Sequence, residues 1–284
     1  MNDLLTYLIS GIALGSSFAL IGSGFVIAYR VTQVVNLAQG SLAVFGGLIS
    51  YSLLQGVLPH GIAELVAVLG SAVVGLVVGV VAIGRRGTDP LLSLIITLGL
   101  SIFSSAVIIL IWGQDPVSPP GLTGRVSIAG AEVERQRLLI VVATMVTFAA
   151  LTFFLTRTYL GKGLTACASN PRAARLVGID VRRMGLIAFG LAGALGGLAG
   201  VLVAPTSAIS FSSDLPLALN GFAAAIFGRL SSPLRTLAGG LLLGIVSQLV
   251  AGYLRGSFQT EVALAMMLLV MVLRSQDFVA EEAK

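Results

Sequence analysis

The sequence predicts an all-α membrane protein, a bundle of about eight or nine transmembrane helices. Of its 284 residues, 56% are hydrophobic and only 10% are charged, whereas roughly a quarter of the residues of a soluble domain are charged. The mean hydropathy is +1.02. The apolar runs are continuous rather than alternating, which argues against a β-barrel. The 35 glycines indicate close helix packing in lipid. We expect one domain, residues 1–284.

The expected membrane spans are apolar runs that reach or approach the roughly 20 residues needed to cross a bilayer. They cover residues 4–29, 41–58, 62–84, 91–113, 138–156, 184–204, 215–228, 237–254 and 262–273. The runs at 215–228 and 262–273 are short. No basic region precedes the first run, so we expect a retained helix rather than a cleaved signal peptide.

Basic residues predict the orientation. Arg85-Arg86 and the polar segment 157–183 carry clustered Lys and Arg, and such loops stay in the cytoplasm. The N-terminus is then outside, and the C-terminus is inside if 215–228 crosses rather than re-enters. The loop 114–137 is external, and its alternation around Gly130 predicts a small hairpin. The loop is either a plain connector or a contact for an external partner.

Several functions are disfavoured by composition. The net charge of +5 comes from residues at span ends that set topology, so we expect no nucleic-acid partner. One histidine, His60, and one cysteine, Cys167, are too few for a metal site. No Walker A motif is present. We therefore expect no catalytic residue, no metal and no cofactor bound by this chain.

The carboxylates are expected at or near span ends, at Glu64, Asp89, Asp214 and Glu261. A charge at mid-bilayer costs about 2.5–3.5 kcal/mol, and this chain is expected to avoid that cost. The absence of a mid-membrane carboxylate argues against a proton- or sodium-coupled carrier.

A polar run between the first two spans contains Asn36, Gln39, Gly40 and Ser41. The first three share one helical side, and Ser41 suits a helix start. A broken helix is tolerated at membrane depth only where it lines a cavity or is buried in protein. The run is either part of a substrate pathway or an ordinary cytoplasmic turn. Residues 37–42 and 237–242 resemble each other faintly, as repeats in transporters do.

The basic segment 157–183 contains a predicted short helix. Asn170 is the expected N-cap and Pro171 the first helical residue. The helix runs over 172–177, and Gly178 ends it. Because so short a helix is marginal in water, it must pack against something, either a protein or anionic lipid headgroups. The residues leave both open.

Four stretches together resemble one family, the branched-chain amino acid ABC transporter permeases of the LivH type. They are residues 36–40 (Asn-Leu-Ala-Gln-Gly), 95–102 (Ile-Ile-Thr-Leu-Gly-Leu-Ser-Ile), 127–133 in the external loop, and the cytoplasmic segment from Gly161-Lys162-Gly163 to Ile179. The match covers nearly the whole chain in order.

The resemblance implies a type II ABC importer permease fold with a short cytoplasmic coupling helix. It also implies a subunit that is not an enzyme but forms the path for branched-chain or similar amino acids. The expected partners are a second homologous permease, membrane lipid, two cytoplasmic ATPase subunits that bind ATP and Mg, and an extracytoplasmic solute-binding protein, in a prokaryotic inner membrane. The implied ATPase contacts are Asn170, Pro171, Ala173, Ala174, Leu176 and Gly178.

One stretch departs from the family pattern. The family's Gly-rich segment before the penultimate span is here 228–235, with Arg229 and Arg235 at two glycine positions. The substrate class is therefore open, and urea or short amides are alternatives. Two further alternatives are a stand-alone carrier or channel and a membrane-embedded enzyme. For an amino acid, we expect its carboxylate to meet a helix N-terminus near Gly40-Ser41.

Overall fold

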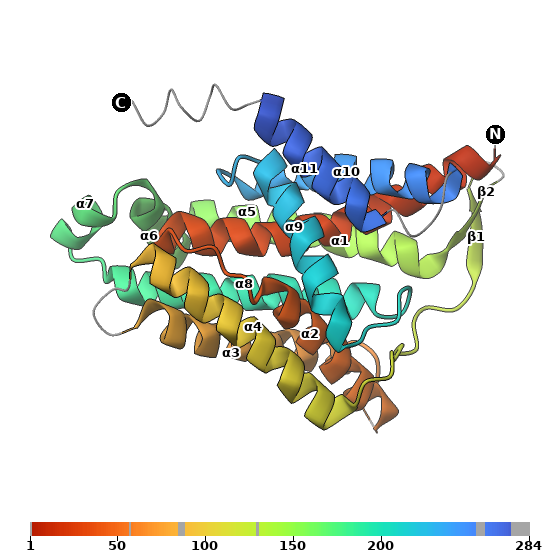
Figure 1. Ribbon diagram of the computed structural model, residues 1–284, viewed down its shortest axis with the longest axis horizontal. Helices are drawn as coiled ribbons and strands as arrows, with labels where there is room; N and C mark the ends of the chain where they lie inside the picture. Colours follow the sequence, from red (N-terminus) through yellow and green to blue (C-terminus); the bar gives the residue numbers. More distant parts are fainter. Residues whose placement is uncertain (1, 57, 85–88, 129–130, 254–258, 274–284) are drawn as a thin grey trace.

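The computed structural model describes residues 2–56, 58–84, 89–128, 131–253 and 259–273. These residues form a predominantly helical bundle with one two-stranded sheet (Figure 1). The elements are α1 (Asn2–Thr32), α2 (Gln39–Gln55), α3 (Ile62–Ile83), α4 (Pro90–Trp112), β1 (Arg125–Ile128), β2 (Ala131–Glu134), α5 (Arg135–Arg157), α6 (Tyr159–Ser169), α7 (Pro171–Leu176), α8 (Val181–Val203), η1 (Phe211–Ser213), α9 (Asp214–Phe227), α10 (Pro233–Tyr253) and α11 (Gln259–Leu273).

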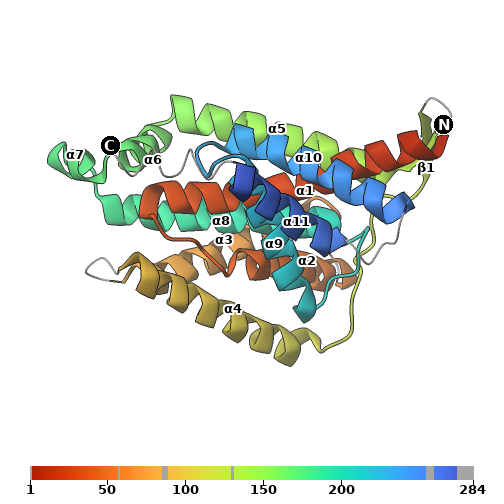
Figure 2. The ribbon, with the colours of Figure 1, turned by 45° about the horizontal axis from the view of Figure 1, so that its top comes forward.

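Helices α1 and α8 form the centre of the bundle, with α10 packed on α1 and α3 packed on α8 (Figures 1 and 2). Glycines bring these pairs into backbone contact. A Cβ on Gly244 would lie 2.3 Å from the Cα of Gly15, and one on Gly75 would lie 2.5 Å from the carbonyl oxygen of Phe189. The close packing expected from the glycine content is therefore present.

Six of the described helices are long and apolar enough to cross a membrane: α1, α3, α4, α5, α8 and α10. The other three predicted spans correspond to the shorter helices α2, α9 and α11. Among the described residues six helices thus reach full span length, and the expected count of eight or nine crossings stays a prediction. Helices α2 and α9 are short because α2 begins at the buried Gln39 and α9 begins at Asp214, beside the middle of α4.

The two ends of the bundle carry different elements. Helices α6 and α7 lie at one end, and the β1–β2 hairpin lies at the other, beside the N-terminus (Figure 1). Arg182 Nε donates a hydrogen bond to the carbonyl oxygen of Gly84 at 3.1 Å. Arg85-Arg86 lie outside the described residues, but this contact puts Gly84 at the end that carries 157–183. Gly84 and the segment 157–183 therefore lie at the same end of the bundle, and the orientation in the membrane stays a prediction.

A hairpin forms where the sequence predicts one, in the loop 114–137. Residues 125–128 pair antiparallel with 131–134, with Arg125 opposite Glu134. An ion pair between Arg125 Nη1 and Glu132 Oε2, 3.0 Å apart, crosses the two strands. Gly130, around which the hairpin was predicted, lies outside the described residues.

Apolar side chains cover the outward faces of α3, α4 and α5. Examples are Leu65, Leu69 and Val77 on α3, Ile102 on α4 and Val146 on α5, all of them exposed in the isolated chain. Lipid or another subunit must cover these faces, because exposing so much apolar surface to water is unfavourable.

Candidate functional site

The polar run 33–41 re-enters the bundle. After α1 ends, the backbone N–H of Leu37 donates to Thr97 Oγ1 at 3.3 Å, and Thr97 Oγ1 donates to the carbonyl oxygen of Val35 at 3.3 Å. Thr97 lies within α4, one of the long helices. The segment therefore lies beside the interior of a long helix, which favours the pathway interpretation over the ordinary cytoplasmic turn.

Asn36 and Gln39 are sealed inside the protein. Both are 0% exposed. Asn36 Oδ1 accepts from the backbone N–H of Ala38 at 3.2 Å, and Gln39 Nε2 donates to the carbonyl oxygen of Ala192 at 2.8 Å. A Cβ on Gly24 would lie 2.1 Å from Gln39 Nε2, so α1 leaves room for this side chain. In this conformation the two amides hold the break between α1 and α2 in place.

Ser41 has a different role from the predicted helix cap. Helix α2 begins at Gln39, and its N-cap, Ala38, makes no side-chain cap. The Ser41 hydroxyl instead lies 3.2 Å from Ser101 Oγ and donates to Asp214 Oδ2 at 3.4 Å. The adjacent Gly40 packs against the start of α9, where its added Cβ would lie 1.9 Å from the carbonyl oxygen of Asp214.

Asp214 is the functional candidate that sequence reasoning missed. Its Oδ2 accepts from Ser105 Oγ at 2.9 Å and from Ser101 Oγ at 3.4 Å. Both serines lie in the middle of α4. The prediction that this chain keeps all its carboxylates at span ends is therefore wrong for Asp214, because α9 starts inside the bundle.

A sequence signal for this cluster exists in α4. Hydroxyl residues recur there every four positions, at Ser93, Thr97, Ser101 and Ser105. Residues four apart share one helical face. A polar stripe on an otherwise apolar span predicts a face turned away from lipid, toward protein or water.

The faint repeat between 37–42 and 237–242 has no structural counterpart. Residues 237–242 lie inside the continuous helix α10, whereas 37–42 include the break before α2. The structural partner of the α2 start is the start of α9, because Gly40 and Asp214 are in contact there.

Around α7, the basic segment 157–183 folds as its local sequence predicts. Asn170 Oδ1 accepts from the backbone N–H groups of Arg172 and Ala173, both at 3.0 Å. Helix α7 covers Pro171–Leu176, and Gly178 follows with a φ of +83°. A preceding helix, α6, was not predicted. It folds back on α5 at Gly161, where an added Cβ would lie 2.0 Å from the carbonyl oxygen of Phe154.

The predicted ATPase contacts divide into two groups. Asn170, Ala173, Leu176 and Gly178 are exposed, and Leu176 is 89% exposed. Ala174 is only 3% exposed and packs in the chain's own core, while Pro171 is half-buried. An apolar side chain as open as Leu176 suits a partner surface, whereas Ala174 cannot reach one without unpacking α7.

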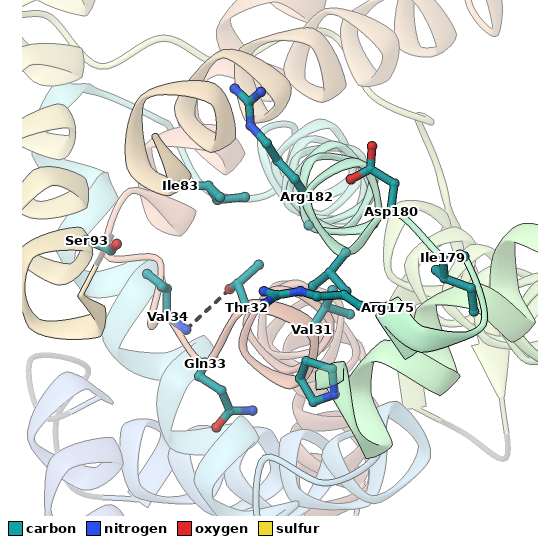
Figure 3. A pocket seen from close by; sticks show the side chains of 14 residues that line it. Val31, Thr32, Gln33, Val34, Ile83, Ser93, Arg175, Ile179, Asp180 and Arg182 are labelled. Atoms are coloured by element: carbon teal, nitrogen blue, oxygen red, sulfur yellow. Dashed lines mark hydrogen bonds between the residues drawn. The ribbon is translucent and has the colours of Figure 1, made fainter. Parts of the chain in front are cut away.

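A cavity of about 660 Å³ joins α7 to the break after α1. It is lined by Thr32 at the end of α1, by Gln33 directly after it, by Arg175 of α7 and by Arg182 of α8, among others. Figure 3 shows the Arg175 side chain reaching across the opening toward Thr32. Helix α7 and the segment that leads into α2 therefore line the same cavity.

Cys167 is predicted to resist thiol reagents in the folded protein. It lies on α6, is buried, and burial raises the pKa of its thiol, so little thiolate forms at neutral pH. Mass spectrometry after maleimide treatment should find this chain unmodified in detergent and fully modified after denaturation. Rapid labelling of the folded protein would contradict the packing of α6.

The departure from the family pattern at 228–235 is visible in the backbone. Arg229 and Leu230 have φ values of +60° and +51°, a left-handed conformation that glycine adopts most readily. The turn between α9 and α10 thus keeps a glycine-like backbone, with arginine and leucine in it.

Among the described residues, no group of three His, Cys, Asp or Glu side chains could hold a metal ion. Six long apolar helices are typical of a multi-pass membrane protein. Comparison with known proteins names the family. The family model for the permease component of branched-chain amino acid transport systems matches residues 7–274, and the chain belongs to this family.

Individual relatives are also permease proteins of branched-chain amino acid transport systems. The chain is 27% identical over 285 residues to the high-affinity branched-chain amino acid transport system permease protein LivH of Escherichia coli K12, covering 94% of this chain and 92% of LivH. It is 27% identical to the corresponding protein BraD of Pseudomonas aeruginosa, over 95% and 94% of the two chains. These relatives are transport permeases rather than enzymes.

A solved structure supports the fold. A chain of PsaBC from Streptococcus pneumoniae, in complex with Fab, superimposes with a TM-score of 0.54 at 14% identity, covering 95% of this chain and 91% of that one. This likeness concerns the fold alone.

Proposed function

We propose that this chain is the permease subunit of a binding-protein-dependent ABC importer in a prokaryotic plasma membrane. It forms, with a second homologous permease, the path for branched-chain or similar amino acids. ATP hydrolysis on two cytoplasmic ATPase subunits drives transport, and an external binding protein delivers the substrate. The observation that carries the proposal is the family match over residues 7–274, which spans every candidate site.

The exposed tip of α7 supports the coupling role. Leu176 and Val177 present apolar side chains at the cytoplasmic end, 89% and 76% exposed. Arg172 and Arg175 flank them. Exposed apolar residues are costly on a lone polar loop but suit a protein groove. Anionic lipid would attract the arginines, whereas a protein groove would also cover the two apolar side chains.

The cavity beside α7 supports a route for the signal. In this proposal ATP binding moves the ATPase groove, α7 follows, and the motion reaches Thr32 and Gln33 through the cavity walls. The segment 33–38 then shifts the start of α2. Because packed interfaces adopt discrete arrangements, such a shift can open the path to one side of the membrane at a time.

The test is reconstitution of the whole transporter. The permease, its partner subunits and the binding protein are purified together and placed in lipid vesicles, and uptake of L-leucine is measured with and without ATP. We expect uptake only with both ATP and the binding protein. The proposal would be refuted if this chain were recovered without an ATPase subunit and gave full uptake in ATP-free vesicles. That result would favour a stand-alone carrier. Uptake of urea or acetamide in place of amino acids would keep the transporter class and overturn the substrate.

A further inference from the structure

The Asp214 cluster lies within the membrane-spanning part of the chain. Helix α4 has 23 residues, and at 1.5 Å per residue Ser101 is about 17 Å from its start and Ser105 about 10 Å from its end. Both serine hydroxyls donate to Asp214. The carboxylate is thus well inside the region that acyl chains occupy.

The open side of the cluster cannot face lipid. Asp214, Ser101 and Ser105 are only half-buried, and the neighbouring Leu215 is 63% exposed. Carboxylates within the membrane almost always face the bundle interior or a water-filled cavity, and mark substrate pathways. This open side therefore belongs to water or to another subunit.

The cluster offers only oxygen acceptors to an incoming group. Asp214 Oδ2 accepts from the hydroxyls of Ser41, Ser101 and Ser105, and Oδ1 accepts from the backbone N–H of Leu215 at 2.6 Å. Each hydroxyl has one proton to donate and keeps lone pairs that can accept. A primary ammonium group has three N–H donors and one positive charge, which this set complements.

The same arrangement excludes the placement expected from the sequence. The start of α2 near Gly40-Ser41 was expected to hold the substrate carboxylate. Asp214 occupies that position, in contact with Gly40 and 3.4 Å from Ser41 Oγ. A second carboxylate there would be repelled, because like charges at such distances are unfavourable.

We propose that Asp214, with the hydroxyls of Ser41, Ser101 and Ser105, receives the ammonium group of the transported amino acid on the translocation path. The inference rests on the proposed importer function and assigns the substrate group that this chain recognises. It selects amino acids over urea, short amides and sugars, which lack a fixed positive charge.

The first experiment measures charge and water at the cluster without altering it. Leu215→Cys is introduced into the complete transporter, where the buried Cys167 gives little background. Cationic and anionic methanethiosulfonate reagents are compared by the mass of this chain, at rest and during ATP turnover. We expect the cationic reagent to react at least about tenfold faster, as fields in charged clefts allow. Asp214→Asn should remove this preference.

Substrate protection then identifies the group that binds. Excess L-leucine should slow modification of Leu215→Cys, whereas 4-methylpentanoate, which has the same carbon skeleton and carboxylate but no ammonium group, should not. Equal protection by both compounds would overturn the proposal. No reaction with either reagent in any state would overturn it as well, because the cluster would then not be open to water.

Transport by Asp214→Asn is the second experiment. The substitution keeps the size of the side chain and removes its charge. We expect L-leucine uptake to fall at least about tenfold, a loss of about 1.4 kcal/mol, with ATP hydrolysis retained. Uptake within twofold of wild type would overturn the inference. Uptake that depends strictly on sodium, and not on the charge of Asp214, would also overturn it. If Asp214→Asn does not assemble, the Leu215→Cys rates decide. Failure of the wild-type transporter to take up any amino acid would instead refute the proposed function.

Discussion

Leu176→Asp is expected to release the ATPase subunits from the complex while the permease remains folded. The side chain is 89% exposed at the end of α7, so the substitution breaks no contact within the chain. In the assembled transporter it would place a charge in an apolar groove. Loss of a well-packed apolar anchor costs about 2 kcal/mol or more, about 30-fold in affinity. Co-purification of the ATPase with a tagged permease measures the effect.

Two control substitutions separate docking from folding. Leu122→Asp makes the same chemical change on the external loop, at a residue that is also exposed, and it should leave the ATPase bound. Ala174→Glu puts a charge into the core behind α7, where Ala174 is 3% exposed, and it should lower the thermal stability of the permease itself. Retention of the ATPase by Leu176→Asp would remove α7 from the coupling interface.

The coupling helix could be predicted from sequence because its determinants are local. The N-cap at Asn170, the proline after it and the glycine at 178 act within one or two turns, and the structure has all three. Which side of the helix faces outward is not local. Only the packing of α6 and α8 shows that Ala174 points inward while Ala173 is exposed.

The candidate substrate site could be predicted only in part, because its residues are far apart in the chain. Asn36 and Gln39 belong to a break that the sequence indicated, but both side chains are fully buried, and Gln39 is enclosed by Gly24 and Ala192. Asp214 looked like a span end, since nothing in its own neighbourhood shows that α9 starts inside the bundle. The hydroxyl stripe on α4 was the available signal for its partners.

Gly40→Ala is expected to abolish uptake by separating the starts of α2 and α9. A Cβ at this position would lie 1.9 Å from the carbonyl oxygen of Asp214 and 2.8 Å from its carbonyl carbon. These are backbone atoms, so no side-chain rotation relieves the clash. The helices must move apart, and the 3.4 Å contact between Ser41 and Asp214 is lost. Overpacking of this kind costs about 1–3 kcal/mol, which a lower unfolding temperature in detergent would report.

Gly99→Ala is the matched control, because Gly99 lies on α4 near the same cluster and an added Cβ there meets nothing within 4 Å. This variant should keep uptake, and its folding stability should rise by up to about 1 kcal/mol, the helix preference of alanine over glycine.

Ala218→Gly tests which contact causes the loss of uptake in Gly40→Ala. The Ala218 Cβ is also near, 2.9 Å from the added atom, but its removal leaves the Asp214 carbonyl in place. Rescue of Gly40→Ala by Ala218→Gly would show that α9 is held there by a side chain and can yield. Absence of rescue would show that the two helix starts meet through their backbones, as a cluster built on Asp214 requires.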